Sequence, residues 1–319
     1  MPSKSTLAAN AAEKAGKLFE SCALCGHRCG VNRINGEKGI CGAGNRIKVS
    51  SVVAHFGEEP FISGDKGSGA IFFSLCNLNC VFCQNHEISQ RDSGEEISSE
   101  DLSKAMLLLQ ERGCHNINLV SPTHFMPLIL DALKIAFENG LNIPIVYNTG
   151  GFDSVELIRL LDGIIDIYMP DLKFIDAKLA KRYSNAGNYP DTAKDAVKEM
   201  FRQVGNIVFD ENEMAVKGLL ARHLVLPGAT ENSKMAMEFL ASVSREVWIS
   251  VMSQYNPMNR AKEFPEIAGT LDQKEYWQVI EKVQDLRMEN YLIQEMGSSE
   301  AYVPDFSRDD PFEAEGRVI

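Results

Sequence analysis

The segment Gly67-Ser-Gly-Ala-Ile-Phe-Phe-Ser-Leu-Cys76-Asn-Leu-Asn-Cys80-Val-Phe-Cys83 places three cysteines directly after an apolar run. The run, residues 70–75, has the Ile- and Phe-rich composition of a buried strand. Three thiolates on one short loop can each bind one iron of a cubane cluster, which leaves the fourth iron without a protein ligand. An open metal position is typical of a reactive centre, whereas structural sites are closed. The segment therefore predicts a [4Fe–4S] cluster with a catalytic role, held at the end of a strand.

A zinc site is the alternative interpretation of this loop. His86 follows Cys83 closely and could complete a set of four zinc ligands. The position of the loop favours the cluster, because β/α folds place their active sites where the strands end.

Apolar runs alternate with amphipathic stretches over the rest of the chain up to residue 294. The expected strands are residues 70–75, 117–120, 143–147, 165–169, 223–226, 247–252 and 291–293. The expected helices are residues 98–112, 126–139, 154–161, 194–204, 233–243 and 273–286. This alternation predicts parallel β/α units with right-handed crossovers. Six or seven units fit a complete or partial TIM-like barrel or an open doubly wound sheet, and periodicity does not choose between these folds.

A second cysteine group lies near the start of the chain, with the spacing Cys22-x2-Cys25-x3-Cys29-x11-Cys41. Four thiolates form a closed ligand set, which fits zinc or a second iron–sulfur cluster. Neighbouring glycines allow the tight backbone that such a loop needs. Unligated thiols are the remaining alternative. The eighth cysteine, Cys114, is expected to be a small buried hydrophobic residue.

These patterns divide the chain into three regions. Residues 1–50 form a Cys-rich metal-binding region that is expected to be rich in loops. Residues 51–296 form the β/α core, and residues 297–319 form an acidic tail. Glu58 and Glu59, near the start of the core, are expected to be a solvated or structural pair of carboxylates.

The composition of the 319-residue chain is that of a globular protein, with 45% hydrophobic and 24% charged residues. Its formal net charge is −12, the opposite sign to that of a general nucleic-acid binder. No apolar run approaches the ~20 residues that span a bilayer, and residues 1–15 lack a signal-peptide core. We therefore expect a cytoplasmic protein with no nucleic-acid and no membrane partner. In that reducing compartment, closely spaced cysteines indicate metal binding rather than disulfides.

The pattern Cys-x3-Cys-x-aromatic-Cys at the end of a first strand resembles the signature of radical S-adenosylmethionine (SAM) enzymes. The wider stretch from Gly67 to Ser89 resembles a narrower group, which is similar to pyruvate formate-lyase activating enzyme and carries an extra N-terminal cysteine motif. This resemblance implies a partial (β/α)6 TIM-like barrel of the radical SAM type with an N-terminal Cys-rich appendage.

The resemblance also implies a radical SAM oxidoreductase. In that family the open iron binds the amino and carboxylate groups of SAM, and one electron cleaves SAM to methionine and a 5′-deoxyadenosyl radical. The radical would abstract a hydrogen atom from a protein or peptide, and activation of a glycyl-radical enzyme is one form of this reaction. An electron donor such as flavodoxin or ferredoxin is implied. The same chemistry on a small metabolite stays open, and so does a non-catalytic module with two closed zinc sites.

Further segments resemble the ends of later strands in the activating enzymes. The residues that the resemblance places around SAM are Phe82, Asn148, Thr149, Met169, Asp171 and Lys173. A lysine there can balance the SAM carboxylate, and Phe82 would lie near the adenine. The alternative for Asp171 and Lys173 is a simple ion pair, because residues two apart share one face of a strand.

Two departures from the family pattern are present. Many radical SAM enzymes carry Gly-Gly-Glu after the second strand, where this chain has Val120-Ser-Pro-Thr-His124. Ser121, Thr123 or His124 would have to supply the polar group. Asn148 stands where the activating enzymes have an acidic residue, and His223 is expected to be a hydrogen-bonded core histidine.

Overall fold

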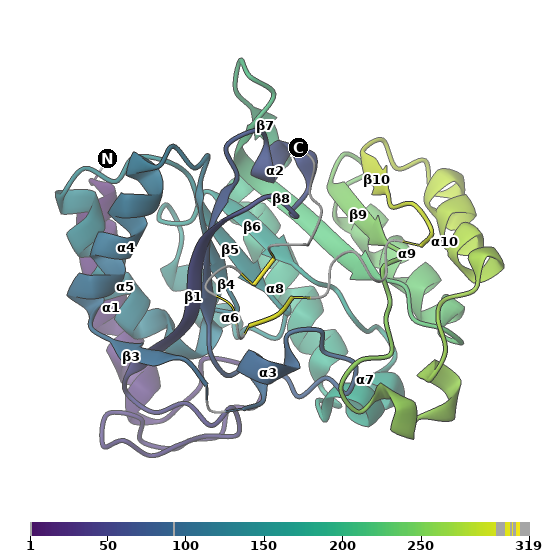
Figure 1. Cartoon of the computed structure of the whole chain (residues 1–319), viewed down its shortest axis with the longest axis horizontal. Helices are drawn as coiled ribbons and strands as arrows, with labels where there is room; N and C mark the ends of the chain where they lie inside the picture. Colours follow the sequence, from purple (N-terminus) through teal and green to yellow (C-terminus); the bar gives the residue numbers. More distant parts are fainter. Residues whose placement is uncertain (1, 92, 298–303, 307, 309–310, 313–319) are drawn as a thin grey trace.

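A computed structural model describes residues 2–91, 93–297, 304–306, 308 and 311–312. Its strands form one sheet in the order β10-β9-β8-β6-β5-β4-β2-β1-β3 (Figure 1). The parallel strands are β2 (Ser68–Phe73), β4 (Ile117–Val120), β5 (Ile145–Thr149), β6 (Ile167–Pro170), β8 (Ala215–Leu224), β9 (Trp248–Met252) and β10 (Tyr291–Ile293). Among the described strands, β10 and β3 are the two ends of this path. The fold is therefore α/β with a partial TIM-like barrel, as the sequence predicts.

Three further strands run antiparallel to their neighbours. β1 (Ile47–His55) pairs with β2 on one side and with β3 (Glu95–Ile97) on the other. β7 (Val208–Phe209) pairs with the start of β8. β1 thus extends the sheet beyond β2, the strand that leads into the central cysteine loop.

The helices cover the outside of the sheet (Figure 1). They are α1 (Lys4–Glu20), α2 (Pro60–Ser63), α3 (His86–Ser89), α4 (Ser99–Glu111), α5 (Met126–Glu138), α6 (Val155–Leu160), α7 (Ala177–Ser184), α8 (Tyr189–Val204), α9 (Thr230–Val243) and α10 (Gln273–Asp285). Short 3₁₀ turns are η1 (Thr123–Phe125), η2 (Ala261–Glu263) and η3 (Pro265–Ile267). Side-chain caps fix several helix starts; Ser98, for example, accepts a hydrogen bond from the backbone N–H of Asp101.

Burial follows the parallel arrangement. Every residue of β2, β5 and β6 is buried, because helices cover one side of the strands and the barrel interior the other. Polar side chains therefore concentrate beyond the carboxyl ends of the strands, where the cysteine loop also lies.

The N-terminal region begins with α1, although the sequence predicts mainly loops there. α1 lies along α5 and buries Ala8, Ala11, Ala15 and Phe19 in the main hydrophobic core. β1 also crosses the expected boundary between residues 50 and 51. The N-terminal region is thus packed into the core along much of its length.

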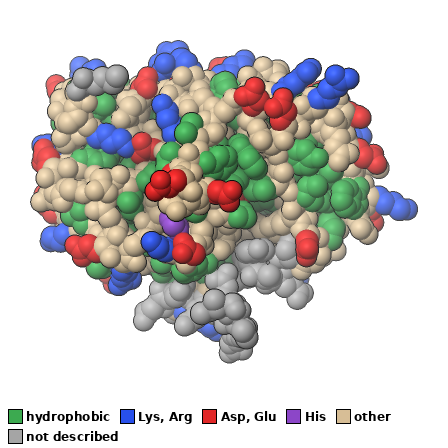
Figure 2. Space-filling view, turned by 90° about the horizontal axis from the view of Figure 1, so that it is seen from above, with side chains coloured by type: hydrophobic (Ala, Val, Ile, Leu, Met, Phe, Trp, Pro, Cys, Tyr) green, Lys and Arg blue, Asp and Glu red, His purple; other side chains and the backbone are tan. Residues whose placement is uncertain are grey.

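Two other features concern the outside of the molecule. Hydrophobic side chains gather over the middle of the end where α2 and β7 lie (Figure 2). The rings of Phe61 in α2, Phe209 in β7 and Trp248 in β9 pack edge to face. No helix among the described residues is long and apolar enough to cross a membrane. Most of the expected acidic tail lies outside the described residues, but the rings of Phe306 and Phe312 pack against Phe72 of β2.

Candidate active site

A cavity of about 410 Å³ opens beyond the carboxyl ends of the parallel strands. The residues of the expected site that line it are Cys76, Cys80, Phe82, Cys83, Asn148, Thr149, Asp171 and Lys173. Met169 is the exception. It is fully buried in a hydrophobic cluster with Phe61 and Val146, on the same face of β6 as Asp171 but one pleat deeper in the barrel. Met169 is absent from the cavity lining, so its contact with SAM stays a prediction.

The loop after β2 carries the three cysteines as free thiols. Leu75 adopts a left-handed backbone (φ 69°), which ends β2 and starts the turn. The backbone N–H of Leu78 approaches Sγ of Cys76 at 3.4 Å. Sγ of Cys80 lies 3.0 Å from the Ser184 hydroxyl. Such hydrogen bonds can stabilise thiolate ligands.

Burial raises the pKa of Cys76 to about 12 and that of Cys80 to about 11, and it raises the pKa of Cys83 as well. The Lys173 ammonium acts in the opposite direction on all three thiols. The thiols are therefore neutral until a metal deprotonates them, and a positive charge already lies close to where the thiolates would form.

The donor set fits an iron–sulfur cluster better than a single zinc ion. Among the described residues, no three His, Cys, Asp or Glu side chains converge on one metal-ion position. A cluster spreads its ligands over several irons and does not require that convergence. His86, the fourth ligand of the zinc alternative, is absent from the cavity lining.

A buried network of charges forms the wall opposite the cysteines. Arg222 on β8 donates to Asp171 at 2.8 Å, to Glu58 at 2.8 Å and to the Asn148 amide oxygen at 2.7 Å. Lys173 donates to the other oxygen of Asp171 at 2.7 Å. Burial alone would raise the pKa of Asp171, but the two cations lower it to about 2. The carboxylate therefore stays ionised, and the network fixes the Lys173 ammonium at the cavity.

Asp171 and Lys173 form an ion pair, and both also line the cavity. The interpretation as an ion pair and the interpretation as cavity residues are therefore compatible. Thr149 faces the cavity, but its hydroxyl donates to Asp153 at 2.7 Å. Phe82 packs against Phe174 and Tyr255, with ring centroids 6.2 and 6.1 Å away.

Sequence reasoning missed Arg222 and the role of Glu58. Glu58 is not solvated, because its side chain is only 9% exposed and it accepts from Arg222 and from the Asn118 amide. A charged residue inside the apolar stretch 219–226 was the available signal, because buried charges are normally paired. Its partners come from three other segments of the chain, so their identity needed the structure.

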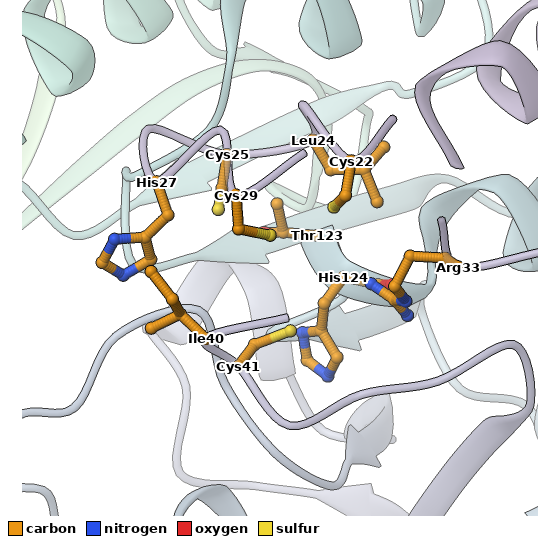
Figure 3. Close-up of a pocket in the computed structure, with 10 residues that line it drawn as sticks. All are labelled: Cys22, Leu24, Cys25, His27, Cys29, Arg33, Ile40, Cys41, Thr123 and His124. Atoms are coloured by element: carbon orange, nitrogen blue, oxygen red, sulfur yellow. The ribbon is translucent and has the colours of Figure 1, made fainter. Parts of the chain in front are cut away.

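Residues 120–124, which stand where many radical SAM enzymes have Gly-Gly-Glu, line two different sites. Ser121 lines the cavity. Thr123 and His124 instead line a pocket beside the N-terminal cysteines (Figure 3). His223 is fully buried and bonded to the Leu172 carbonyl and the Ser233 hydroxyl, which confirms it as a core histidine.

Residues 70–240, more than half of the chain, match the Radical SAM superfamily. The chain belongs to this superfamily. Radical SAM proteins are enzymes that bind a [4Fe–4S] cluster and SAM and that need a reductant, and these properties hold for this chain.

Similar proteins agree with this membership. An uncharacterized protein of Methanocaldococcus jannaschii is 32% identical over 84% of this radical SAM chain and 76% of its own length. The pyruvate formate-lyase-activating enzyme of Clostridium pasteurianum is 24% identical over 56% of this chain and 69% of its own. Among solved structures, Streptococcus suis SuiB bound to the precursor peptide SuiA aligns with a TM-score of 0.50 and 15% identity. That alignment covers 73% of this chain and only 50% of SuiB, and it concerns the fold alone.

Proposed function

We propose that Cys76, Cys80 and Cys83 bind three irons of the [4Fe–4S] cluster and that the adjoining cavity holds SAM. The supporting observation is that three free thiols, one buried and two half-buried, and the Lys173 ammonium line one cavity at the carboxyl ends of the strands. When bound, the cluster supplies the electron that cleaves SAM into methionine and a 5′-deoxyadenosyl radical.

The side chains around the cavity suggest separate roles. Lys173 can pair with the SAM carboxylate, since its ammonium is held by Asp171 and lines the cavity. Asn148 and Thr149 are bonded to Arg222 and Asp153, so we assign them to positioning the cavity wall. Phe82 offers an apolar surface to the adenine and excludes water together with Tyr255.

We propose that the radical abstracts a hydrogen atom from a protein or peptide. A volume of about 410 Å³ lies at the low end of the roughly 300–1,000 Å³ of small-molecule sites. SAM itself is of drug size, so little of this volume remains for a second compact molecule. An extended peptide segment needs only to insert one residue through the mouth.

The relative from Clostridium pasteurianum supports a protein substrate, because its name identifies an enzyme as its target. Activation of a glycyl-radical enzyme is the specific form of the proposal. The alternative substrate is a small metabolite, which would need the mouth of the cavity to widen. Membership of the radical SAM superfamily disfavours the zinc-only module.

The ligand assignment is tested with the anaerobically reconstituted enzyme. Cys76→Ala, Cys80→Ala and Cys83→Ala should each abolish reductive SAM cleavage, measured as 5′-deoxyadenosine. Cys114→Ala is the matched control, because Cys114 is buried, precedes β4 and is absent from the cavity lining. Cleavage retained in any one of the three variants would remove that cysteine from the ligand set.

The substrate class is tested with a dialysed anaerobic cell extract. We expect the macromolecular fraction to stimulate repeated SAM cleavage and protease treatment to remove the stimulation. A glycyl radical formed in that fraction would give an electron paramagnetic resonance (EPR) signal that outlasts removal of the enzyme. Stimulation by the dialysable fraction alone would assign a small metabolite instead.

A further inference from the structure

The loop between α1 and β1 gathers the four N-terminal cysteines around one pocket. Figure 3 shows Cys22, Cys25, Cys29 and Cys41 beside Thr123 and His124, which follow β4. The four thiols are free. A Cβ atom built on Gly39 would lie 2.6 Å from Sγ of Cys29, so only glycine leaves room for that sulfur.

Arg33 places a positive charge in this pocket without a carboxylate partner among the described residues. It is fully buried (0% exposed) and lies over the Phe19 ring at 4.6 Å. Its guanidinium donates to two backbone carbonyls, those of Gly44 and His124. Nη1 is buried and has no hydrogen-bond partner in the described part of the chain. Buried charges in proteins are normally paired, so this cation indicates that an anion belongs in the pocket.

The four cysteines that line the pocket can supply that anion as thiolates bound to a metal. A metal that binds four thiolates removes their protons and leaves a net charge of about −2, whether it is a zinc ion or a [4Fe–4S] cluster.

His124 connects the pocket with the central cysteine loop. Its Nε2 donates to the backbone carbonyl of Ser74, two residues before Cys76, at 2.8 Å. Its Nδ1 is buried, lacks a partner among the described residues and therefore keeps an open lone pair. His124 therefore ties the segment beside the N-terminal cysteines to the backbone just before the central cysteine loop.

We propose that Cys22, Cys25, Cys29 and Cys41 bind a metal as a tetrathiolate centre, with Arg33 as its buried counter-cation. The cysteines do not converge on a single ion position as they stand, which favours a cluster. The enclosed volume of about 10 Å³ favours one ion. Both metals share the anionic tetrathiolate chemistry, and metal analysis separates them.

The first test counts metal in the full-length reconstituted protein. We expect either one zinc or about four additional irons with sulfide per chain, beyond the four irons of the central cluster. Cys25→Ala combined with Cys41→Ala should remove this second portion and leave the central irons, whereas Cys114→Ala should keep both. A wild-type protein with four irons and no zinc would overturn the proposal. So would a Cys25→Ala/Cys41→Ala variant that retains the second portion.

A second test isolates the N-terminal site. The triple variant Cys76→Ala/Cys80→Ala/Cys83→Ala should retain the second portion of metal alone. Its EPR spectrum after reduction should show a cluster if that metal is iron, and no signal if it is zinc. Absence of all metal from a folded triple variant would refute the tetrathiolate centre without bearing on the central ligands.

The role of Arg33 is tested by metal retention. Arg33→Met keeps an unbranched apolar stem but removes the charge, so it should release the N-terminal metal to a chelator at least tenfold faster than wild type. Arg33→Lys should restore part of the retention. Arg46→Met is the matched control, because Arg46 is an exposed arginine on the same loop. Equal release rates for Arg33→Met and wild type would overturn the counter-cation role.

Discussion

Arg222 and Lys173 share one carboxylate, Asp171, and thereby connect the cavity wall to the charge that faces the cysteines. The two cations are not equivalent. Both line the cavity, but Arg222 is held by three partners from three other segments, whereas Lys173 has one side-chain partner. We therefore expect Arg222 to act in stability and Lys173 in SAM binding.

Lys173→Ala should weaken SAM binding by roughly 10- to 100-fold, because a charge-assisted hydrogen bond contributes about 1.5–3 kcal/mol. The cluster should still form, with unchanged iron content. Equilibrium binding of SAM to the reconstituted protein measures the effect. Lys178→Ala, an exposed lysine five residues further on, is the control. Unchanged SAM affinity in Lys173→Ala would remove this lysine from the site.

Arg222→Met should lower the free energy of unfolding by roughly 3–5 kcal/mol, because it leaves the buried carboxylates of Glu58 and Asp171 without this cation. Urea unfolding under anaerobic conditions measures it. The double variant Arg222→Met/Glu58→Gln should recover part of the loss, since one of the stranded charges is removed. Additive effects of the two substitutions would show that the pair is not coupled.

At this scale the cysteines were predictable and the charge network was not. Close spacing after an apolar run is a local pattern, so the sequence could predict that Cys76, Cys80 and Cys83 lie together after β2, and their role as ligands stays a prediction. The contacts of Arg222 join β8 to residues after β6, at the end of β5 and before α2. No local pattern encodes contacts over such separations. Met169 shares a face of β6 with Asp171 but lies deeper, in the hydrophobic interior of the barrel, and the depth of a residue along a strand is not visible in its sequence pattern.

Among the elements, α1 shows how small side chains set a helix–helix distance. Ala8, Ala11 and Ala15 are spaced three and four residues apart and are buried. They let α1 approach α5 closely. The polar composition of this segment concealed the helix, because a stripe of alanines carries little hydrophobic signal.

Ala8→Leu should destabilise the protein by roughly 1–3 kcal/mol, because a larger side chain has no space at a fully buried position. Asn10→Leu introduces the same side chain on the exposed face of α1 and should leave stability nearly unchanged. The difference between the two urea midpoints measures the packing effect. Equal midpoints would mean that α1 can move away from α5 without loss of stability.

β8 was predicted only at its end, as residues 223–226, although it begins at Ala215. Its first half contains Lys217 and Gly218, and Gly218 has φ 128°. A charge and a glycine interrupt the apolar pattern that marks a buried strand. The structure explains both, because β7 pairs alongside Lys217 and a Cβ on Gly218 would lie 2.5 Å from the backbone of Ile207.

The stability of the whole molecule should depend on pH through the buried His223. Burial lowers the pKa of His223 from its ordinary value of 6.5 to about 4. A group whose pKa is lower in the folded state stabilises that state above its unfolded pKa. The nearby charges of Lys173 and Asp171 act on it in opposite directions. His223 therefore contributes to stability above pH 6.5, and this contribution is lost as the pH falls toward 4.

His223→Asn should flatten the pH dependence of unfolding between pH 6.5 and 4. One proton taken up on unfolding changes the free energy by about 1.4 kcal/mol per pH unit. Denaturant unfolding at several pH values compares the slopes of variant and wild type. Asparagine can still donate to the Leu172 carbonyl, so the variant retains one of the two hydrogen bonds. Identical slopes in both proteins would contradict a neutral, buried His223.

The overall architecture was the most predictable level. Alternating strands and helices are a regular pattern, and six of the helices and seven of the parallel strands coincide in part with the expected segments. Periodicity could not decide between a barrel and an open sheet, because that depends on how the strands pair at the edges. The sequence also did not indicate that residues 1–50 pack into the core.

The pocket of the N-terminal cysteines has a consequence for biosynthesis. Its thiols leave the ribosome well before Thr123 and His124, which line the same pocket and follow only after α4 and β4. Until then Arg33 lacks the His124 carbonyl that holds its guanidinium. The thiols of a nascent chain are thus exposed to oxidants, and the pocket closes around them only once the first half of the sheet has folded.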